Sequence, residues 1–249
     1  MSSFSHRIQT RYYAPPSAVH GDRLVLPPEE AHHALRVLRA AAGQEIEVVD
    51  GEGGWYRVRL DEADRRTAAG TILERRREVG EPDYSLTVGL AMLKNPSRYE
   101  TFLEKATELG VTAVLPLQTA RTQKARLKTA RAQNILVSAM KQCGRSRQVH
   151  LSDVVDFTDV IAANTAGLKV ICHEAGPLED NLSALLAREP SLPRHILLLV
   201  GPEGGFSDDE VAAAQRAGFQ VASLGPRRLR AETAALTAVA AIMLSAATT

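Results

Sequence analysis

A glycine-rich turn, GPEGG at residues 201–205, is the part of this chain best suited to bind a small molecule. Gly204 and Gly205 leave no Cβ to hinder a ligand that approaches the main chain. Glu203 adds a carboxylate that could accept a proton. Without a ligand, the same letters would make a tight strand-to-helix connection, and on shape alone the two interpretations are equally supported.

Two elements must position this turn. The apolar run 195–200 is short and ends at Gly201-Pro202, which favours a strand buried on both faces of a parallel sheet. Ser207 and Glu210 have the spacing of a capping box, so a helix is predicted from Asp208 to just before Gly218. Ligands of open α/β sheets lie at the carboxyl ends of strands, where this turn is expected.

A second loop of the same kind follows a strand that ends at Leu224. Gly225-Pro226 breaks the strand, and the arginines of the loop stand before a helix with Glu232 and Thr233 in its first turn. Free N–H groups at the two helix starts and the guanidinium groups would suit an anionic or electron-rich partner in a shared pocket. The final helix is apolar nearly all round, as expected of a core or a subunit interface. The arginines are Arg227, Arg228 and Arg230.

Residues 121–147 contain eight basic and no acidic residues, although the whole chain is balanced with 30 Lys and Arg against 29 Asp and Glu. With a net charge of +1, any polyanion site must be local. The stretch predicts a phosphate-binding surface, although a solvated helix face explains it equally well. The arginines of the N-terminal part could extend that surface; these are Arg7, Arg11, Arg36 and Arg39.

The general composition limits the class of protein. The chain has 249 residues, 45% of them hydrophobic, and its only cysteines, Cys143 and Cys172, lack the spacing of a zinc or redox motif. No apolar leader and no run of 18 apolar residues is present, so a soluble cytoplasmic protein is expected. P-loop, dinucleotide, nucleophile-elbow and metalloprotease motifs are absent, and His32 and His33 suit packing or RNA contact, so no metal is expected.

The organisation of the chain changes near residue 80. Residues 11–74 are strand-like, with one helix expected over 28–43 that buries Ala31, Leu35 and Leu38 and stops at Gly43. After the charged segment 75–82, strands and helices alternate, with a long helix near 123–142. The pattern predicts a small β-rich domain over 1–79 and a mostly parallel α/β domain over 80–249.

The chain resembles the knotted SPOUT-class methyltransferases that methylate N3 of a uridine in 16S ribosomal RNA. Four motifs carry the resemblance together with the first domain's HHALRVLRAAAGQEIEVVDGEGGWY: LKNPSRYETFLEKATELGVTAVLPLQTART, MKQCGR, LLLVGPEGGFSDDE and LGPRRLRAETA. The family implies a PUA-like β-barrel that binds RNA, a trefoil-knot α/β domain with helices on both faces of its sheet, and a homodimer. Cys143, where a small hydroxyl residue is expected, is a mild departure.

The resemblance also implies S-adenosylmethionine as methyl donor, held by three loops. The residues it assigns to the donor are His173, Glu174, Leu199, Gly201, Pro202, Gly204, Gly205, Leu224, Gly225, Leu229 and Thr233. The residues expected to bind RNA are Arg7, Arg11, Arg36, Arg39, Arg121, Lys124, Arg126 and Arg145.

Methylation of uracil N3 requires that the N3 proton leave. Arg227 or Arg230 could stabilise the anion that develops on the uracil carbonyls, and Glu203 or Glu232 could accept the proton. Each carboxylate also has a purely structural interpretation: Glu232 favours a helix N-terminus, and Glu203 orders its loop.

Two other functions fit the same sequence. One is a methyltransferase of the same fold that acts on a ribose 2′-hydroxyl. The other is a non-catalytic assembly factor that binds ribosomal RNA. Analysis of the methylated product distinguishes the ribose methyltransferase from a uracil methyltransferase, because ribose methylation blocks alkaline cleavage of the RNA. Binding of S-adenosylmethionine distinguishes an enzyme from the assembly factor, which should not bind it.

Overall fold

The computed structural model describes residues 11–64, 67–123, 126–163, 165–174, 181–189 and 191–246. Arg7 and Lys124, both predicted to bind RNA, lie outside these residues. The chain forms two compact units, one of residues 1–81 and 137–148 and the other of residues 82–136 and 149–249.

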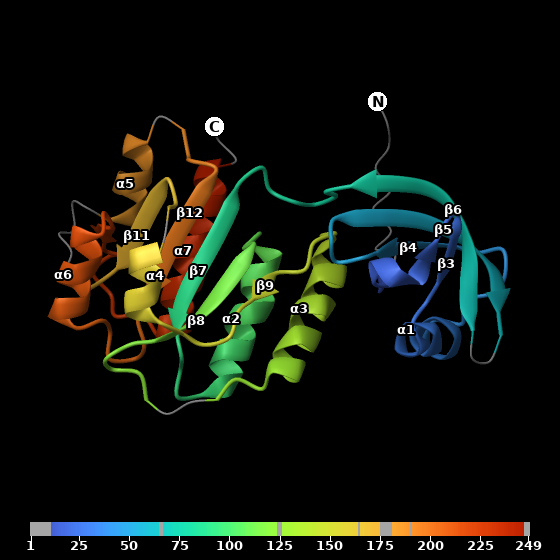
Figure 1. Cartoon of the computed structure of the whole chain (residues 1–249), viewed down its shortest axis with the longest axis horizontal. Helices are drawn as coiled ribbons and strands as arrows, with labels where there is room; N and C mark the ends of the chain where they lie inside the picture. Colours follow the sequence, from blue (N-terminus) through green and yellow to red (C-terminus); the bar gives the residue numbers. More distant parts are fainter. Residues whose placement is uncertain are drawn as a thin grey trace. The chain divides into compact units, whose positions relative to one another are not determined.

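The N-terminal unit is built on a six-stranded sheet that curls around its own core (Figure 1). Its order is β1-β4-β5-β6-β3-β2, antiparallel except between β1 and β4. Buried side chains such as Tyr12, Val48 and Leu60 fill the inside of the curl, in agreement with the small PUA-like domain predicted. The strands are β1 (Arg11–Tyr13), β2 (Val19–His20), β3 (Arg23–Val25), β4 (Glu45–Val49), β5 (Gly54–Ala63) and β6 (Ala68–Arg77), with a 3-10 turn, η1, at Pro16–Ala18.

The helix predicted over 28–43 is shorter, and its buried face differs. Helix α1 covers Pro28–His32 and continues as a π-helical turn, η2, over His33–Val37. Ala31 is buried and Leu35 packs against the core, as predicted, but the wider turn changes the register, so Ala34 is buried while Leu38 is 42% exposed. Arg39 then takes a positive φ of 54°, which ends the helix well before Gly43.

The second unit contains a parallel sheet, as predicted. The strand order is β10-β8-β7-β12-β11-β13, and β9 pairs with β8 outside this path. Every pair in the sheet is parallel. The strands are β7 (Ser85–Ala91), β8 (Ala113–Gln118), β9 (His150–Leu151), β10 (Val155–Asp156), β11 (Leu168–Cys172), β12 (His195–Val200) and β13 (Gln220–Ala222).

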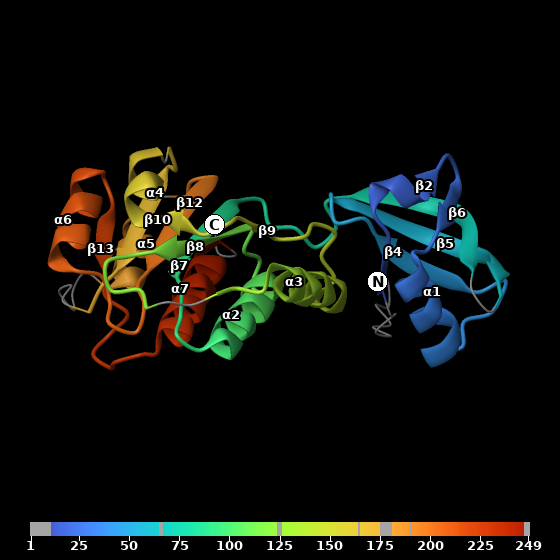
Figure 2. The same ribbon diagram turned by 60° about the horizontal axis from the view of Figure 1, so that its bottom comes forward.

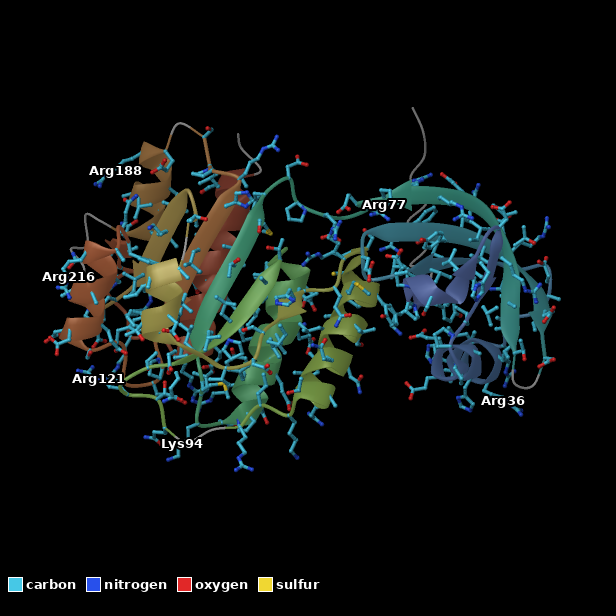
Figure 3. All side chains as sticks on the ribbon, in the orientation of Figure 1. Arg36, Arg77, Lys94, Arg121, Arg188 and Arg216 are labelled. Carbon is cyan, nitrogen blue, oxygen red and sulfur yellow. The ribbon has the colours of Figure 1, made fainter. Side chains whose placement is uncertain are left out.

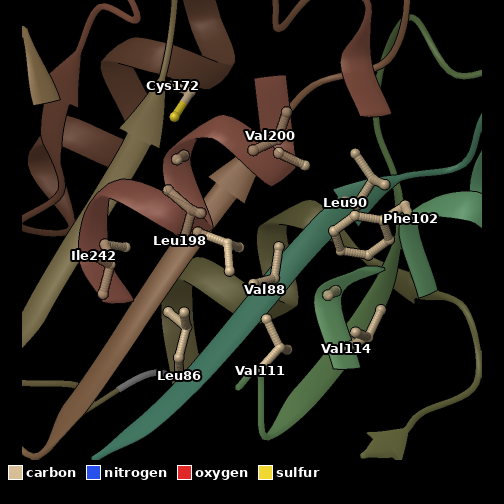
Figure 4. Packing of buried hydrophobic residues seen from close by; sticks show 14 of the residues in the cluster. Leu86, Val88, Leu90, Phe102, Val111, Val114, Cys172, Leu198, Val200 and Ile242 are labelled. Carbon is tan, nitrogen blue, oxygen red and sulfur yellow. The ribbon is translucent and has the colours of Figure 1, made fainter. Parts of the chain in front are cut away.

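Helices cover both faces of this sheet (Figure 2). The alternation of β12 explains the two layers, because Leu198 and Val200 belong to one apolar cluster, and Leu197 and Leu199 belong to the other. Figure 4 shows the first cluster. Helices α2 (Pro96–Glu108), α3 (Thr129–Cys143), α5 (Leu182–Arg188) and α7 (Ala231–Ala246) contribute to the first layer, and α4 (Phe157–Ala163) and α6 (Asp208–Arg216) to the second.

Three predicted helices can be compared with these. Helix α6 has the predicted bounds, whereas α3 begins at Thr129, several residues after the predicted start near 123. Helix α7 buries Ala235, Val239 and Ile242 in the core, in agreement with its apolar sequence. Within the described part of the chain, no helix combines the length and apolar character that a membrane crossing requires.

Candidate active site

A cavity of about 350 Å³ opens where β11, β12 and β13 end. β12 and β13 flank β11 in a parallel sheet, so the loops that follow them meet at one edge. The two loops predicted to share a pocket therefore do so, together with the loop after β11. The lining residues are Arg121, Cys172, His173, Glu174, Val200, Gly201, Pro202, Glu203, Gly204, Gly205, Phe206, Leu224, Gly225, Arg227, Arg228, Leu229, Arg230, Ala231 and Ala234.

Glycine is required at different positions of these loops for different structural reasons. A Cβ on Gly201 would lie 2.9 Å from both the carbonyl carbon of Gly205 and the nitrogen of Phe206, so only glycine lets the turn close on itself. Gly205 and Gly225 have positive φ angles of 69° and 100°, and no atom lies within 4 Å of a Cβ built there. The main chain at these two positions is thus open to a ligand.

The capping box predicted after the turn is present. The Ser207 hydroxyl accepts a hydrogen bond from the Glu210 N–H, and the Glu210 carboxylate accepts one from the Ser207 N–H at 2.8 Å. The same carboxylate also accepts the Ala120 N–H at 2.8 Å. Glu210 therefore ties the end of the glycine turn to the segment after β8, a contact that its spacing did not reveal.

Arg121 reinforces this connection. Its Nη1 donates to the carbonyl oxygens of Gly204 at 2.8 Å and Phe206 at 3.2 Å (Figure 3). The guanidinium thus holds the glycine turn and lines the cavity, a role in loop position that its sequence did not predict.

The arginine-rich loop forms the opposite wall. Arg227, Arg228 and Arg230 are exposed around the half-buried Leu229, and all four line the cavity. Arg228 Nε lies 3.9 Å from the Glu174 carboxylate, and both side chains are largely exposed, so this ion pair is weak. The guanidinium groups remain accessible to a ligand in the cavity.

The two carboxylates suggested as proton acceptors lie in different surroundings. Glu203 lines the cavity, and its Oε1 accepts the Lys94 N–H at 3.2 Å. Glu232 does not line it; the side chain is 12% exposed, and Oε1 lies 3.6 Å from Arg98 Nε. The geometry therefore favours Glu203 over Glu232 as the group that meets a ligand.

Two donor-binding predictions fall outside the cavity wall. Leu199 is completely buried among the side chains packed under α4 and α6, because it points to the other face of the sheet from Val200, which does line the cavity. Thr233 is exposed on α7 and is also not a lining residue.

Sequence reasoning missed five lining residues: Cys172, Val200, Phe206, Ala231 and Ala234. Strand alternation together with the position of each strand end would have found Val200 and Cys172. Burial raises the pKa of the Cys172 thiol to about 12, so at neutral pH it lines the cavity as a protonated, weakly polar group and not as a nucleophile.

Four of the eight basic residues of 121–147 are paired with acids from other parts of the chain. Arg145 and Glu81 are 3% and 6% exposed and form an ion pair of 2.8 Å, so Arg145 is buried and paired where the prediction required an accessible phosphate contact. The other pairs are Arg131 with Glu100, Lys141 with Glu30 and Arg147 with Glu78.

The remaining RNA-binding candidates differ in availability. Arg11 is bound to Glu47 through a 2.7 Å ion pair, whereas Arg36, Arg39 and Arg126 are exposed. In the described residues, no cluster of three or more His, Cys, Asp or Glu side chains is arranged to hold a metal ion.

Comparison with known protein families identifies both parts of the chain. Residues 80–243 match a family described as an RNA methyltransferase domain, which includes all the cavity-lining loops. Residues 26–73 match the RNA methyltransferase PUA domain.

Individual relatives cover nearly the whole chain. Ribosomal RNA small subunit methyltransferase E of Synechocystis sp. is 33% identical over 245 residues, which are 97% of this chain and 79% of the relative. A crystal structure of a probable rRNA methyltransferase from Porphyromonas gingivalis has a TM-score of 0.86 and 32% identity over 96% of this chain and 99% of its own.

A further solved structure carries a ligand. Ribosomal RNA small subunit methyltransferase E from Neisseria gonorrhoeae, bound to S-adenosyl methionine, has a TM-score of 0.81 and 30% identity, covering 95% of this chain and 97% of its own. The cavity is built from three strand-end loops, the family model matches the domain that contains it, and the relatives span both units. The chain therefore belongs to the RNA methyltransferase family.

Proposed function

We propose that this protein transfers the methyl group of S-adenosylmethionine to N3 of a uridine in 16S ribosomal RNA of the small subunit. The observation that carries the proposal is the cavity at the strand ends, in which an open glycine turn and three accessible arginines line the same space. The small-subunit methyltransferase relatives support the RNA class, and the S-adenosyl methionine in the Neisseria gonorrhoeae structure supports the donor.

The residues of the cavity fit the donor. Glycine main chain open to the cavity can approach an adenosyl group closely, and Leu224, Leu229 and Val200 offer apolar contacts. When bound, S-adenosylmethionine supplies an electrophilic methyl group. The residues proposed to hold it are His173, Glu174, Gly201, Pro202, Gly204, Gly205, Leu224, Gly225 and Leu229.

The side chains of the cavity would act on the acceptor. Removal of the N3 proton leaves negative charge on the uracil ring and its carbonyl oxygens, and Arg227 and Arg230 would stabilise this charge. Glu203, the carboxylate that lines the cavity, would accept the proton. Alignment in a site that excludes water would supply much of the remaining rate enhancement.

The rest of the molecule would deliver the RNA. We assign residues 1–79 to RNA binding and residues 80–249 to catalysis, with Arg36, Arg39 and Arg126 as the exposed candidates for phosphate contact. The protein would act in the cytoplasm as a homodimer. Leu244, which is 63% exposed on α7, is the apolar side chain we place nearest to that interface.

The test is methyl transfer from methyl-labelled S-adenosylmethionine to small ribosomal subunits, or to their naked RNA, from cells that lack the homologous activity. Mass spectrometry of the digested RNA should find the label in 3-methyluridine. Label on a ribose would favour the 2′-hydroxyl alternative, and the absence of donor binding by a folded protein would favour the assembly factor.

A further inference from the structure

A second cavity, of about 460 Å³, adjoins the candidate active site. It is lined by Lys94, Asn95, Pro96, Arg98, Gln123 and Glu203. Glu203 lines the first cavity too, so the two cavities share a wall at this carboxylate. None of the other five residues was a candidate from the sequence.

The segment 94–98 contacts two carboxylates, one of which, Glu203, lines both cavities. The Lys94 N–H donates to Glu203, and Arg98 Nε lies 3.6 Å from the Glu232 carboxylate. Glu232 directly follows Ala231, which lines the first cavity. One short segment thus fixes the two side chains that we considered as proton acceptors.

The segment itself is rigidly anchored. The Asn95 side chain accepts the Ser97 N–H at 3.0 Å and caps α2, while Pro96 occupies the first turn of the helix. Tyr99 is buried, and its hydroxyl donates to the carbonyl of Leu90 at 3.3 Å. Lys94 and Arg98 are therefore presented from a fixed backbone.

The second cavity has cationic side chains at its exposed side and the Glu203 carboxylate at the wall that it shares with the first cavity. The Lys94 side chain is exposed (Figure 3). In the described part of the chain, no carboxylate is paired with its ammonium group. Basic residues elsewhere in this unit, such as Arg131, have such partners. An accessible ammonium group next to a carboxylate at the shared wall suits a ligand with a phosphate at one end and an acidic N–H at the other.

We propose that the second cavity is the subsite for the acceptor uridine nucleotide, with Lys94 bound to its phosphate and Glu203 at its base; this rests on the methyl transfer proposed above. In the reaction the N3–methyl bond forms, the sulfur–methyl bond of the donor breaks, and the N3 proton passes to the Glu203 carboxylate. Arg98 is a positioning residue that holds the Glu232 carboxylate next to Ala231, which lines the first cavity.

The first test is the variant Lys94→Gln. We expect the KM for RNA to rise about tenfold, the affinity for S-adenosylmethionine by calorimetry to stay within twofold, and the slope of log affinity for RNA against log salt to fall by about one. Arg216→Gln, which removes an exposed charge from α6, is the matched control and should change none of these (Figure 3). A Lys94→Gln enzyme with the wild-type KM and salt slope would overturn the proposal.

The second test compares Arg98→Lys with Arg98→Gln. If Arg98 positions Glu232, Arg98→Gln should lower kcat several-fold, and Arg98→Lys, which keeps the charge, should recover most of the loss. Equal loss in both, at unchanged KM for RNA, would contradict the positioning role. Wild-type protein that binds no donor or transfers no methyl would refute the proposed function itself, whereas active wild-type protein with an unaffected Lys94→Gln variant refutes only the subsite.

Discussion

The glycine-loop cavity and the basic stretch 121–147 were both predicted from short runs of letters, with opposite outcomes. The loops at 201–205 and 224–230 do meet in one cavity. The positive charge of the basic stretch is partly neutralised, because four of its residues are paired with carboxylates. The comparison shows that the backbone conformation of a glycine turn can be predicted from a short segment of sequence, whereas the net charge of a surface cannot.

The physical reason lies in the range of the interactions. A capping box joins residues three apart, and a glycine acts through its own φ and ψ. The ion pairs of the basic stretch join residues separated by 31 to 111 positions. Such partners are set by the fold, and no window of sequence contains them.

The largest effect is expected at the buried pair. Arg145→Met should lower the free energy of unfolding by about 3 to 5 kcal/mol, because Glu81 would remain buried without its charged partner. Chemical denaturation measures this change. The double variant Arg145→Met/Glu81→Gln should be more stable than the single one, and unchanged stability with weakened RNA binding would restore Arg145 as a phosphate contact.

A large effect is also expected at Gly201. In Gly201→Ala the new Cβ would displace backbone at Gly205 and Phe206, and an error of about 1 Å in the turn should weaken donor binding on the order of 100-fold. Gly204→Ala is the comparison, since its Cβ would meet only the Arg121 side chain at ordinary contact distance and should cost a few-fold. Calorimetry with S-adenosylmethionine checks both, and equal losses would contradict this account of the turn.

A substitution of Arg121 distinguishes a role in the glycine turn from a role in RNA binding. Arg121→Gln removes both hydrogen bonds to the glycine turn and should raise the Kd for S-adenosylmethionine about tenfold, with no change in the salt slope of RNA binding. Calorimetry and RNA titration at several salt concentrations separate the two roles. A reduced salt slope at normal donor affinity would return Arg121 to the RNA surface.

The smallest effect is expected at the exposed pair of Arg131 and Glu100. The Arg131 guanidinium lowers the pKa of the Glu100 carboxyl, so the pair contributes stability above the ordinary Glu pKa and loses it as the pH falls through the lowered value. Arg131→Gln should therefore have a slightly lower Tm than wild type at pH 7 and an equal Tm near pH 2. A difference that grows at low pH would reverse the sign of this interaction.

Much of the fold was accessible to sequence reasoning. The parallel sheet, strand β12 and the capping box of α6 follow from apolar runs, alternation and local hydrogen bonds. The π-helical turn at His33–Val37 could not be predicted in this way, because the analysis of hydrophobic spacing assumes the 3.6 residues per turn of an α-helix. The trefoil knot that the family resemblance implies stays a prediction, and no connection rule suggests one, since chain connections almost never thread.

The candidate site was less completely predicted. The glycines and arginines were recognisable by type, but Leu199 was assigned to the wall in place of Val200, because strand alternation was not applied to the last residue of β12. Lys94 and Arg98 lie about one hundred residues before the loops they adjoin, and their place beside Glu203 depends on β7 and β12 being neighbours in the sheet.

Hydrogen–deuterium exchange with and without S-adenosylmethionine tests most directly that the three strand-end loops form the donor site. Peptides that cover 172–174, 200–206 and 224–234 should become protected at saturating donor, while those of 126–147 should not change. Protection centred on 126–147, or no protection in a folded protein, would contradict the assignment of the cavity.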